Sequence, residues 1–327
     1  MIIPIKVIFG FMKKLFTAII LCLIVSSTFA QPKPVFKVVP LGVYGGSDES
    51  NLSAYMLAPV SSNAYICLDA GTLHAGIEKA VSNRVFTVPA DTILKRYIKG
   101  YCISHPHLDH LAGMVINSPD DAPKNIYALP YTIGVLRDNY FTWKSWANFG
   151  SEGDKPVLNK YHYIPLVPSA KTSLENTTMT AQAFVLSHGN PYESTAFLVA
   201  NNGNYMLYLG DTGADEIEKS TRLHELWQYI APLIKNHTLK GMMIEVSFPD
   251  EQPVKSLFGH LTPHLLMQEM ATLGKLTGTE AMRNFPVVIT HIKPAGHHEA
   301  EIKKQLITQN ALGLKLVMPV QGKLLEF

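Results

Sequence analysis

The sequence predicts an α/β fold with a polar site at the edge of its β-structure. Short apolar runs rich in β-branched and aromatic residues alternate with helical segments along residues 35–327. Several of these predicted strands end in an ionisable side chain, and α/β folds place their sites at the carboxyl ends of strands. The strand ends in question are Ser104-His105, Ser187-His188, Gly210-Asp211 and Thr290-His291.

Composition places the chain among globular proteins. It has 327 residues, of which 47% are hydrophobic and 17% charged, so it can bury a large core and is not a disordered chain. No internal repeat or linker interrupts residues 31–327, which we expect to form a single domain.

Residues 1–30 have the layout of a secretory signal peptide, with an expected start at Met12. Lys13 and Lys14 precede an apolar stretch, and small residues lead up to Ala30. The alternative is a membrane anchor, but the apolar run 15–25 is too short to span a bilayer comfortably. We therefore expect cleavage after Ala30 and a periplasmic protein without a membrane partner.

Export changes the charge of the chain. Residues 1–30 contribute three lysines and no acid, so the formal charge of +2 becomes −1 in the mature protein. Such a chain lacks the basic stripe that nucleic acids require, and no nucleic-acid partner is expected. Cys67 and Cys102 remain, either as buried free thiols or as one disulfide between adjacent strands.

Local patterns predict the individual elements in order. Helices are expected near 75–80 and 111–117, and a third should begin where Thr262 is the N-cap and Pro263 the first helical residue. The predicted strands are 35–44, 52–60, 63–71, 98–104, 126–130, 181–187, 195–200, 205–210, 242–247 and 285–290.

The segment HPHLDH, residues 105–110, is the most specific feature of the sequence. It places three histidines and an aspartate in six residues directly after a strand. Crowding these groups has a desolvation cost and no packing benefit, which disfavours a purely structural role. Imidazole and carboxylate suit zinc or a similar divalent ion, and a catalytic metal needs three protein ligands and an open position. Four candidates in one segment therefore favour two metal ions.

The other strand ends offer the remaining ligands. They provide His188, Asp211 and His291, and Asp211 has two oxygens with which it can bridge both ions. A lone histidine at a strand end is more often a hydrogen-bonded residue than a ligand. Because His188 and His291 occur together with the cluster at 105–110, we expect both to be metal ligands.

The run H-x-H-x-D-H, followed by separate His, Asp and His at strand ends, resembles the metallo-β-lactamase fold superfamily. That resemblance implies a four-layer αββα sandwich of two mixed β-sheets flanked by helices. Residues 105–119, HPHLDHLAGMVINSP, resemble the signature of the class II cyclic-nucleotide phosphodiesterases, and LDAGT, SHG, LYLGDTG, EVSFPD, GHLTP and THIKP follow in that family's order. The resemblance covers residues 35–327. It implies one zinc on His105, His107 and His188, a second on Asp109, His110 and His291, and Asp211 as the bridge.

The resemblance also implies hydrolysis of 3′,5′-cyclic nucleotides to 5′-nucleotides, with the choice between cAMP and cGMP left open. A hydroxide shared by two cations is a nucleophile at neutral pH, because metal binding lowers the pKa of water. The predicted catalytic residues are Asp109 in the metal cluster, His260 as general acid and Glu245 as the group that orients His260. His260 stands beside a predicted helix N-terminus, a ready anion site, although a surface histidine near a cap is the alternative.

The sequence supports less specific predictions for a few other residues. Asp69 is expected to orient a ligand or to serve the structure, and Lys293 to reach the substrate phosphate or to be solvated. A ring-rich segment follows residue 130, whose rings either stack on a nucleobase or, as we favour, belong to the core. These rings are Tyr140, Phe141, Trp143 and Trp146.

Three other functions stay open. The chain could be an exported metallo-hydrolase of the same fold acting on a lactone or another ester. An RNA 3′-processing nuclease is opposed by export and by the near-zero charge. A non-enzymatic metal- or nucleotide-binding protein is disfavoured because mere binding needs no open two-metal site. The oligomeric state is not indicated, and a dimer is compatible with the sequence.

The expected leader gives a first prediction. The mature protein should begin at about Gln31 and be released in soluble form from the periplasm, because small residues precede that position. N-terminal sequencing of the protein from a periplasmic extract checks this. A membrane-embedded product that retains residues 15–25 would contradict it.

Overall fold

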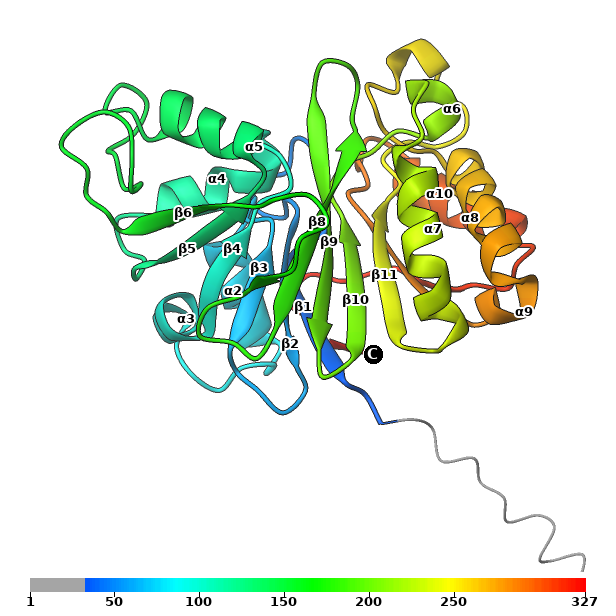
Figure 1. The fold of residues 1–327 in the computed structure, drawn as a ribbon, viewed down its shortest axis with the longest axis horizontal. Coiled ribbons are helices and arrows are strands. Elements are labelled where there is room, and N and C mark those ends of the chain that lie inside the picture. The colour runs from blue at the N-terminus through cyan, green and yellow to red at the C-terminus, as the bar shows by residue number, and fades with distance from the viewer. Residues whose placement is uncertain (1–32) are drawn as a thin grey trace, which may run out of the picture. The chain divides into compact units, whose positions relative to one another are not determined.

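Two β-sheets of seven strands each lie face to face at the centre of the structure, with helices on both outer sides (Figure 1). The structure is a computed structural model that describes residues 33–327, so the expected signal peptide lies outside the described residues. Val35–Phe327 forms one compact unit. In this part of the chain no helix is long and apolar enough to cross a membrane.

The first sheet is formed by the first half of the chain and the C-terminal strand. Its members β1 to β3 are antiparallel, whereas β3 to β6 are parallel. In spatial order the strands are β14 (Leu325–Glu326), β1 (Phe36–Gly42), β2 (Ala54–Pro59), β3 (Tyr65–Leu68), β4 (Ile98–Cys102), β5 (Lys124–Ala128) and β6 (Tyr161–Pro165).

The second sheet also combines antiparallel and parallel strands, and all of them come from the second half of the chain. Its members β7 to β10 are antiparallel, and β10 to β13 are parallel. In spatial order the strands are β13 (Lys315–Val317), β12 (Pro286–Thr290), β11 (Leu239–Glu245), β10 (Asn204–Leu209), β9 (Glu193–Asn201), β8 (Thr180–Ser187) and β7 (Thr172–Ser173).

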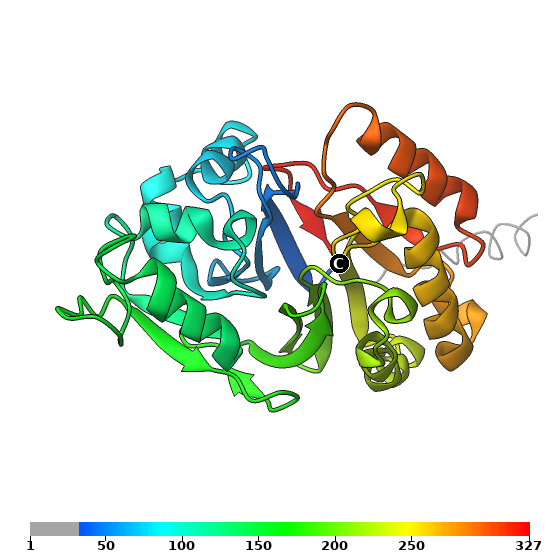
Figure 2. The same ribbon diagram turned by 90° about the horizontal axis from the view of Figure 1, so that it is seen from above.

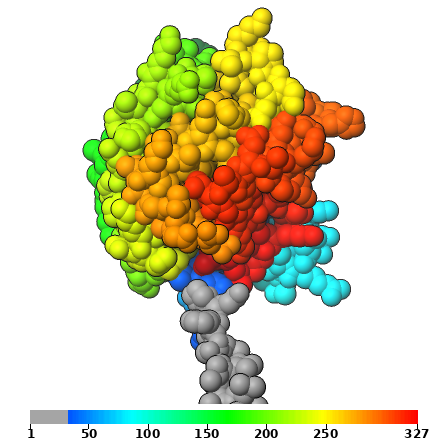
Figure 3. All heavy atoms as spheres, turned by 90° about the vertical axis from the view of Figure 1, so that its right-hand side faces the viewer, coloured from blue at the N-terminus to red at the C-terminus, as the bar shows by residue number. Residues whose placement is uncertain are grey.

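Helices cover the outer face of each sheet, as the view from above shows (Figure 2). The first layer consists of α2 (His74–Ser82), α3 (Ala90–Thr92) with η1 (Ile93–Tyr97), α4 (Leu108–Asn117), and α5 (Pro130–Val135) with η2 (Leu136–Tyr140). The second consists of α6 (Asp215–Glu218), α7 (Arg222–Lys235), η3 (Val254–Ser256), α8 (Pro263–Thr277), α9 (Thr279–Met282) and α10 (His298–Gln309). Figure 3 shows α8 and the segments after it, in orange and red, on the outer face of the second half.

Three apolar clusters hold these four layers together. One lies between the sheets and includes Phe36 and Phe197. The second joins the first sheet to its helices through residues such as Ile77, and the third buries Trp227 of α7 under the second sheet. Strands buried on both faces read as continuous apolar runs, which is why the sequence revealed most of them. The predicted four-layer sandwich of two mixed sheets is confirmed.

The expected helix after Thr262 is present. The Thr262 side chain accepts a hydrogen bond from the Leu265 backbone N–H, and Pro263 is the first helical residue. This is the usual chemistry of a helix start, because the first backbone N–H groups of a helix have no partner within the helix.

The two cysteines do not pair, so the disulfide alternative is wrong. Both are buried free thiols. The register of β3 and β4 sets Cys102 opposite Leu68, and Cys67 opposite Tyr101. Successive side chains of a strand point to opposite faces, so Cys67 packs toward the helices while Cys102 packs between the sheets.

Close backbone packing positions the start of α4, which carries Asp109 and His110. Gly71, in the loop after β3, accepts a hydrogen bond from the Gly113 N–H of α4 at 2.9 Å. A β-carbon on Gly71 would lie 2.0 Å from the backbone oxygen of Asp109. Only glycine therefore allows this loop and the helix to meet.

This contact gives a stability prediction. Gly71→Ala should lower the free energy of unfolding by about 1–3 kcal/mol, because the added methyl group overpacks against backbone that cannot move aside. Gly134→Ala in α5 is the matched control, since nothing lies within 4 Å of a β-carbon there. It should be neutral or stabilising by about 0.5–1 kcal/mol, because alanine favours the helix. Urea unfolding compares the two variants, and equal midpoints would contradict the prediction.

Candidate active site

The ionisable residues predicted at strand ends meet at one edge of the two sheets. Asp69 follows β3 and His105 follows β4 in the first sheet. His188 follows β8, Asp211 follows β10, and His291 follows β12 in the second. Parallel strands send their carboxyl ends to the same edge, so both sheets deliver side chains to one place.

The structure brings all seven predicted metal ligands together. Among the described residues, five groups of three have candidate ligand atoms within 4.8 Å of one another, and two of these groups match the predicted sets. These two groups are His105 with His107 and His188, and Asp109 with His110 and His291. They are the two sets that the family resemblance implied. Whether each residue ligates a metal stays a prediction.

Asp211 lies between the two groups. Its Oδ1 is 3.2 Å from Nε2 of His110, and its Oδ2 is 3.2 Å from Nε2 of His291. The same Oδ2 is 3.7 Å from Nε2 of His105 and 3.8 Å from Nε2 of His188. Asp211 is only 2% exposed. One carboxylate therefore faces histidines of both groups.

The donor set fits two divalent cations. Nε2 of His110 and Oδ1 of Asp211 are buried without a hydrogen-bond partner among the described residues. A buried polar atom without a partner is costly, so two such atoms facing each other indicate a missing group. Imidazole and carboxylate are the ligands that zinc takes in catalytic sites. The residues present therefore suit such ions, with Asp211 shared.

Hydrogen bonds behind the cluster orient four of its rings. Nδ1 of His110 donates to Asp69 at 2.7 Å, and Nδ1 of His188 donates to the Gly259 carbonyl at 2.9 Å. Nδ1 of His291 is 2.9 Å from the Ser247 hydroxyl, and Nδ1 of His105 is 3.0 Å from that of Ser104. With Nδ1 engaged, Nε2 of each ring is the nitrogen left for the cluster.

Asp69 occupies the place of an orienting residue, as one of our two interpretations expected. It is fully buried and accepts hydrogen bonds from the Ser104 N–H, the Ser104 hydroxyl and the Tyr208 hydroxyl, in addition to His110. Tyr208 belongs to the second sheet and Ser104 to the first. Asp69 therefore ties both sheets and α4 together directly behind the cluster.

Burial and neighbouring charges shift the pKa values of the cluster histidines in different directions. Burial lowers the pKa of His105 well below its ordinary value and lowers the pKa of His188 to about 4. Burial also opposes charge on His110, but Asp211, Asp69 and Asp109 outweigh it and raise the pKa of His110 well above its ordinary value. The first two rings are neutral at neutral pH, which is the form that binds metal. The carboxylates around His110 therefore favour positive charge at this point of the cluster.

Glu245 and His260 form a buried pair beside the cluster, as the sequence suggested. Nδ1 of His260 donates to Oε1 of Glu245 at 2.8 Å, and the Thr212 N–H donates to the same oxygen at 3.0 Å. Burial opposes charge on His260, yet Glu245 outweighs it, and the pKa of His260 is raised. His260 is 4% exposed, so the alternative of a surface histidine is wrong.

Ser247 is a member of the site that sequence reasoning missed. Its hydroxyl donates to Oε2 of Glu245 at 2.6 Å and lies 2.9 Å from Nδ1 of His291. It therefore links the Glu245–His260 pair to the metal cluster. A signal was available, since Ser247 stands two residues after Glu245 at the end of β11, a spacing that sends both side chains to one face.

The aromatic side chains of the segment after residue 130 lie partly in the core and partly on the surface. Phe141 is fully buried, as the core interpretation expected, whereas Trp143 and Trp146 are 44% and 37% exposed. The Trp146 indole donates to Ser118, and the Tyr140 hydroxyl donates to the backbone of Pro106 at 3.0 Å. For the two tryptophans the core interpretation is wrong, because the segment 141–159 follows the outer face of the first helical layer (Figure 1).

Comparisons of the whole chain with known proteins point to one family. A sequence model of the family described as cAMP phosphodiesterases class-II matches residues 36–322. A 3′,5′-cyclic-nucleotide phosphodiesterase of Aliivibrio fischeri is 40% identical over 320 residues, which cover 94% of this chain and 97% of the relative. A probable 3′,5′-cyclic-nucleotide phosphodiesterase of Yersinia pestis is 36% identical over 307 residues, which cover 89% of each protein.

Solved structures of known proteins share the fold. Unliganded yeast PDE1 superposes with a TM-score of 0.80 at 23% identity, over 90% of this chain and 100% of that one. The metallo-β-lactamase fold protein YhfI of Bacillus subtilis has a TM-score of 0.59 at 18% identity, over 90% of this chain and 100% of that one. The architecture is thus the metallo-β-lactamase fold that the sequence resembled.

The position of Asp211 gives a prediction about metal content. Purified protein should carry close to two divalent ions, and Asp211→Ala should lose metal and activity to a greater extent than His188→Ala. Removal of a shared carboxylate would expose two cations to each other's repulsion, whereas His188 would hold only one ion. Elemental analysis and activity measurements on both variants check this, with the exposed Asp120→Ala as control. A fully active Asp211→Ala protein would refute the shared site.

Proposed function

The chain belongs to the class-II cAMP phosphodiesterases and is a 3′,5′-cyclic-nucleotide phosphodiesterase, and from this premise we propose that it cuts the cyclic phosphate at the cluster around Asp211 with two bound divalent ions. The single observation that carries the proposal is the pair of three-residue groups on either side of that carboxylate. We propose zinc as the metal, because most of the candidate ligands are imidazoles.

The chain's own residues define where the phosphate would sit. His105, His107 and His188 would hold one ion, Asp109, His110 and His291 the other, and Asp211 both. When bound, such a pair of ions supplies a water of lowered pKa and neutralises charge on the phosphoryl oxygens. Because the ring nitrogens are already fixed by hydrogen bonds, the side chains need little rearrangement to receive the ions.

His260 is the proposed general acid. Glu245 and Ser247 contact its Nδ1, and among the described residues no hydrogen bond involves its Nε2, which leaves that nitrogen for a substrate. The raised pKa of His260 keeps a proton available at neutral pH. His260 would therefore give a proton to the ribose oxygen that departs when the ring of the cyclic phosphate opens.

The proposal also covers the substrates of the protein and its location. The cluster would bind the cyclic phosphate, which cAMP and cGMP share, so we propose that the protein hydrolyses both nucleotides. We also propose that the protein works in the periplasm, which rests on the leader-like sequence of residues 1–30.

The acid role of His260 can be separated from metal binding. His260→Ala should keep its metal and lower kcat for cAMP by about 10²- to 10⁴-fold, the usual contribution of a positioned acid. Bis(p-nitrophenyl) phosphate should be affected much less, since its leaving group departs as an anion. Measurement of kcat on both substrates, together with metal content, checks this.

Two results would count against that role. Equal losses on both substrates would mean that His260 binds the phosphate. Loss of metal would mean that His260 is a ligand, a role its closeness to His188 and Asp211 makes worth testing. His264→Ala, on the exposed first turn of α8, is the matched control and should behave as wild type.

A further inference from the structure

An exposed aromatic ring stands directly beside the metal cluster. Tyr192 is 48% exposed, and its ring centroid lies 5.0 Å from that of His107 in an edge-to-face arrangement. His107 and Asp109 are half-buried, whereas His105, His110, His188 and His291 are buried, so the open side of the cluster is where His107 and Asp109 lie. Tyr192 therefore lines the approach to the cluster.

We propose that Tyr192 is the surface on which the nucleobase of the substrate stacks. This inference rests on the proposed function, because it places the cyclic phosphate between the two groups of ligands. The base of a cyclic nucleotide is then one ribose away from the phosphate, and Tyr192 is an exposed ring next to a predicted ligand of that site, His107. Base stacking on an aromatic side chain suits purines in general, because every base has a π-face.

The turn that carries Tyr192 is fixed on both sides while its tip is free. The Tyr192 N–H donates to the Gly189 carbonyl at 3.0 Å, and the Gly189 N–H donates to Glu218 at 2.9 Å. On the far side Glu193 pairs with Arg222 at 2.8 Å. Gly189 has φ +63°, a conformation that glycine adopts without strain. The ring is thus presented from a tethered loop, which reduces the entropy lost on binding.

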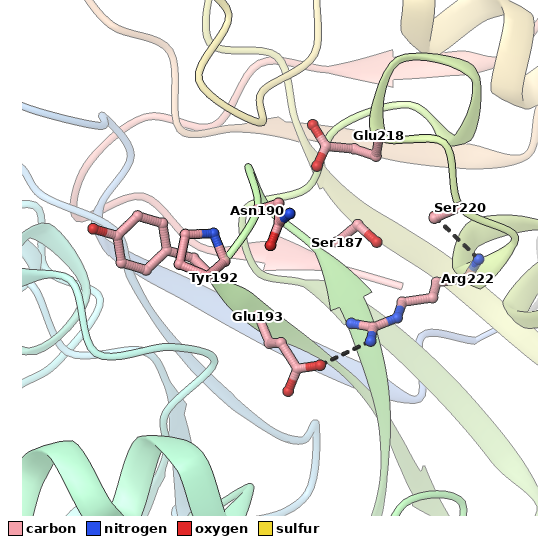
Figure 4. A pocket seen from close by; sticks show the side chains of 8 residues that line it. Ser187, Asn190, Tyr192, Glu193, Glu218, Ser220 and Arg222 are labelled. Atoms are coloured by element: carbon pink, nitrogen blue, oxygen red, sulfur yellow. Dashed lines mark hydrogen bonds and ion pairs between the residues drawn. The ribbon is translucent and has the colours of Figure 1, made fainter.

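The orientation of the side chain supports a role at the cluster. Tyr192 also stands at the rim of a cavity of about 260 Å³, whose other lining residues are Ser187, Asn190, Pro191, Glu193, Glu218, Ser220 and Arg222. In Figure 4 the ring of Tyr192 points away from the ion pair of Glu193 and Arg222. Its hydroxyl makes no hydrogen bond to any described residue, so the phenol is not held for a structural purpose.

Other rings near the cluster are less suited to this task. The Tyr140 hydroxyl is bonded to the Pro106 backbone, and Trp146 is bonded to Ser118. Phe248 lies 5.8 Å from His260, but Lys293 covers its face at 5.5 Å. Tyr192 combines exposure and closeness to a predicted ligand with a hydroxyl that has no hydrogen bond to any described residue.

The test compares two cyclic phosphates that differ only in the base. The first is cAMP, and the second is the methyl glycoside of ribose 3′,5′-cyclic phosphate, which has no base. Tyr192→Ala should raise KM for cAMP by about 5- to 150-fold with kcat little changed, the range expected for one stacked base. KM for the base-free substrate should stay as in wild type. Tyr192→Phe should behave as wild type, because stacking needs the ring and not the hydroxyl.

The controls separate this inference from other roles of the residue. Tyr229→Ala removes a tyrosine of similar exposure, 44%, from α7 and should change neither KM. Equal rises of KM on both substrates would overturn the inference, since Tyr192 would then act through His107. A Tyr192→Phe variant that behaves like Tyr192→Ala would overturn it in favour of a hydroxyl contact.

Failure of the proposed function would look different. If wild-type protein hydrolyses neither cyclic phosphate, the proposed function falls, and this inference falls with it. If wild type hydrolyses both with the same KM, the phosphodiesterase activity stands and the base contact alone is refuted.

Discussion

The burial of one carboxylate at the meeting of two sheets is the constraint on which the rest of the structure depends. Asp211 is 2% exposed and lies between His110 of α4, which covers the first sheet, and His291, which follows β12 of the second sheet. Burial opposes its charge, but His110 and His291 outweigh that effect and hold its pKa well below the ordinary value. A buried charge survives only when opposite charge or hydrogen bonds compensate it. The surrounding imidazoles, and two cations if bound, provide that compensation.

The supporting hydrogen bonds decide how this centre can work. Asp69, Ser247 and the Gly259 carbonyl each hold Nδ1 of a different histidine. In this way the protein fixes ring orientation before any metal arrives, and such outer partners tune affinity in metal sites generally. Ser247 also contacts Glu245, which holds His260. The ligand side and the proton-donating side of the site therefore share one rigid support.

The candidate metal cluster and the proposed base contact lie on different kinds of structure. Glu245 and most of the candidate ligands stand at or near strand ends that packing on both faces holds in place, and Asp109 and His110 stand on the first turn of α4. Tyr192 stands instead on a turn whose flanks are tethered and whose tip is free. Loops tolerate change better than strands, so relatives with this fold can keep the chemistry and alter the contact with the rest of the substrate.

The sequence by itself determined the local features of this protein. The apolar runs, the cluster at 105–110, and the Thr262–Pro263 helix start each depend on residues within a few positions of one another. The alternation of side chains along a strand also marked which residues would share a face. Resemblance to a family then added the grouping of the ligands, which spacing alone left open.

Tertiary structure decided the contacts between distant segments. Asp69 meets His110 across 41 residues of chain, and Ser247 meets His291 across 44. The register of β3 and β4 separated Cys67 from Cys102, and the turn after His188 brought Tyr192 to His107. Each of these depends on strand order and register, in which a shift by one residue reverses every side chain. Local patterns carry no information about that order, because it arises only when the sheets pack.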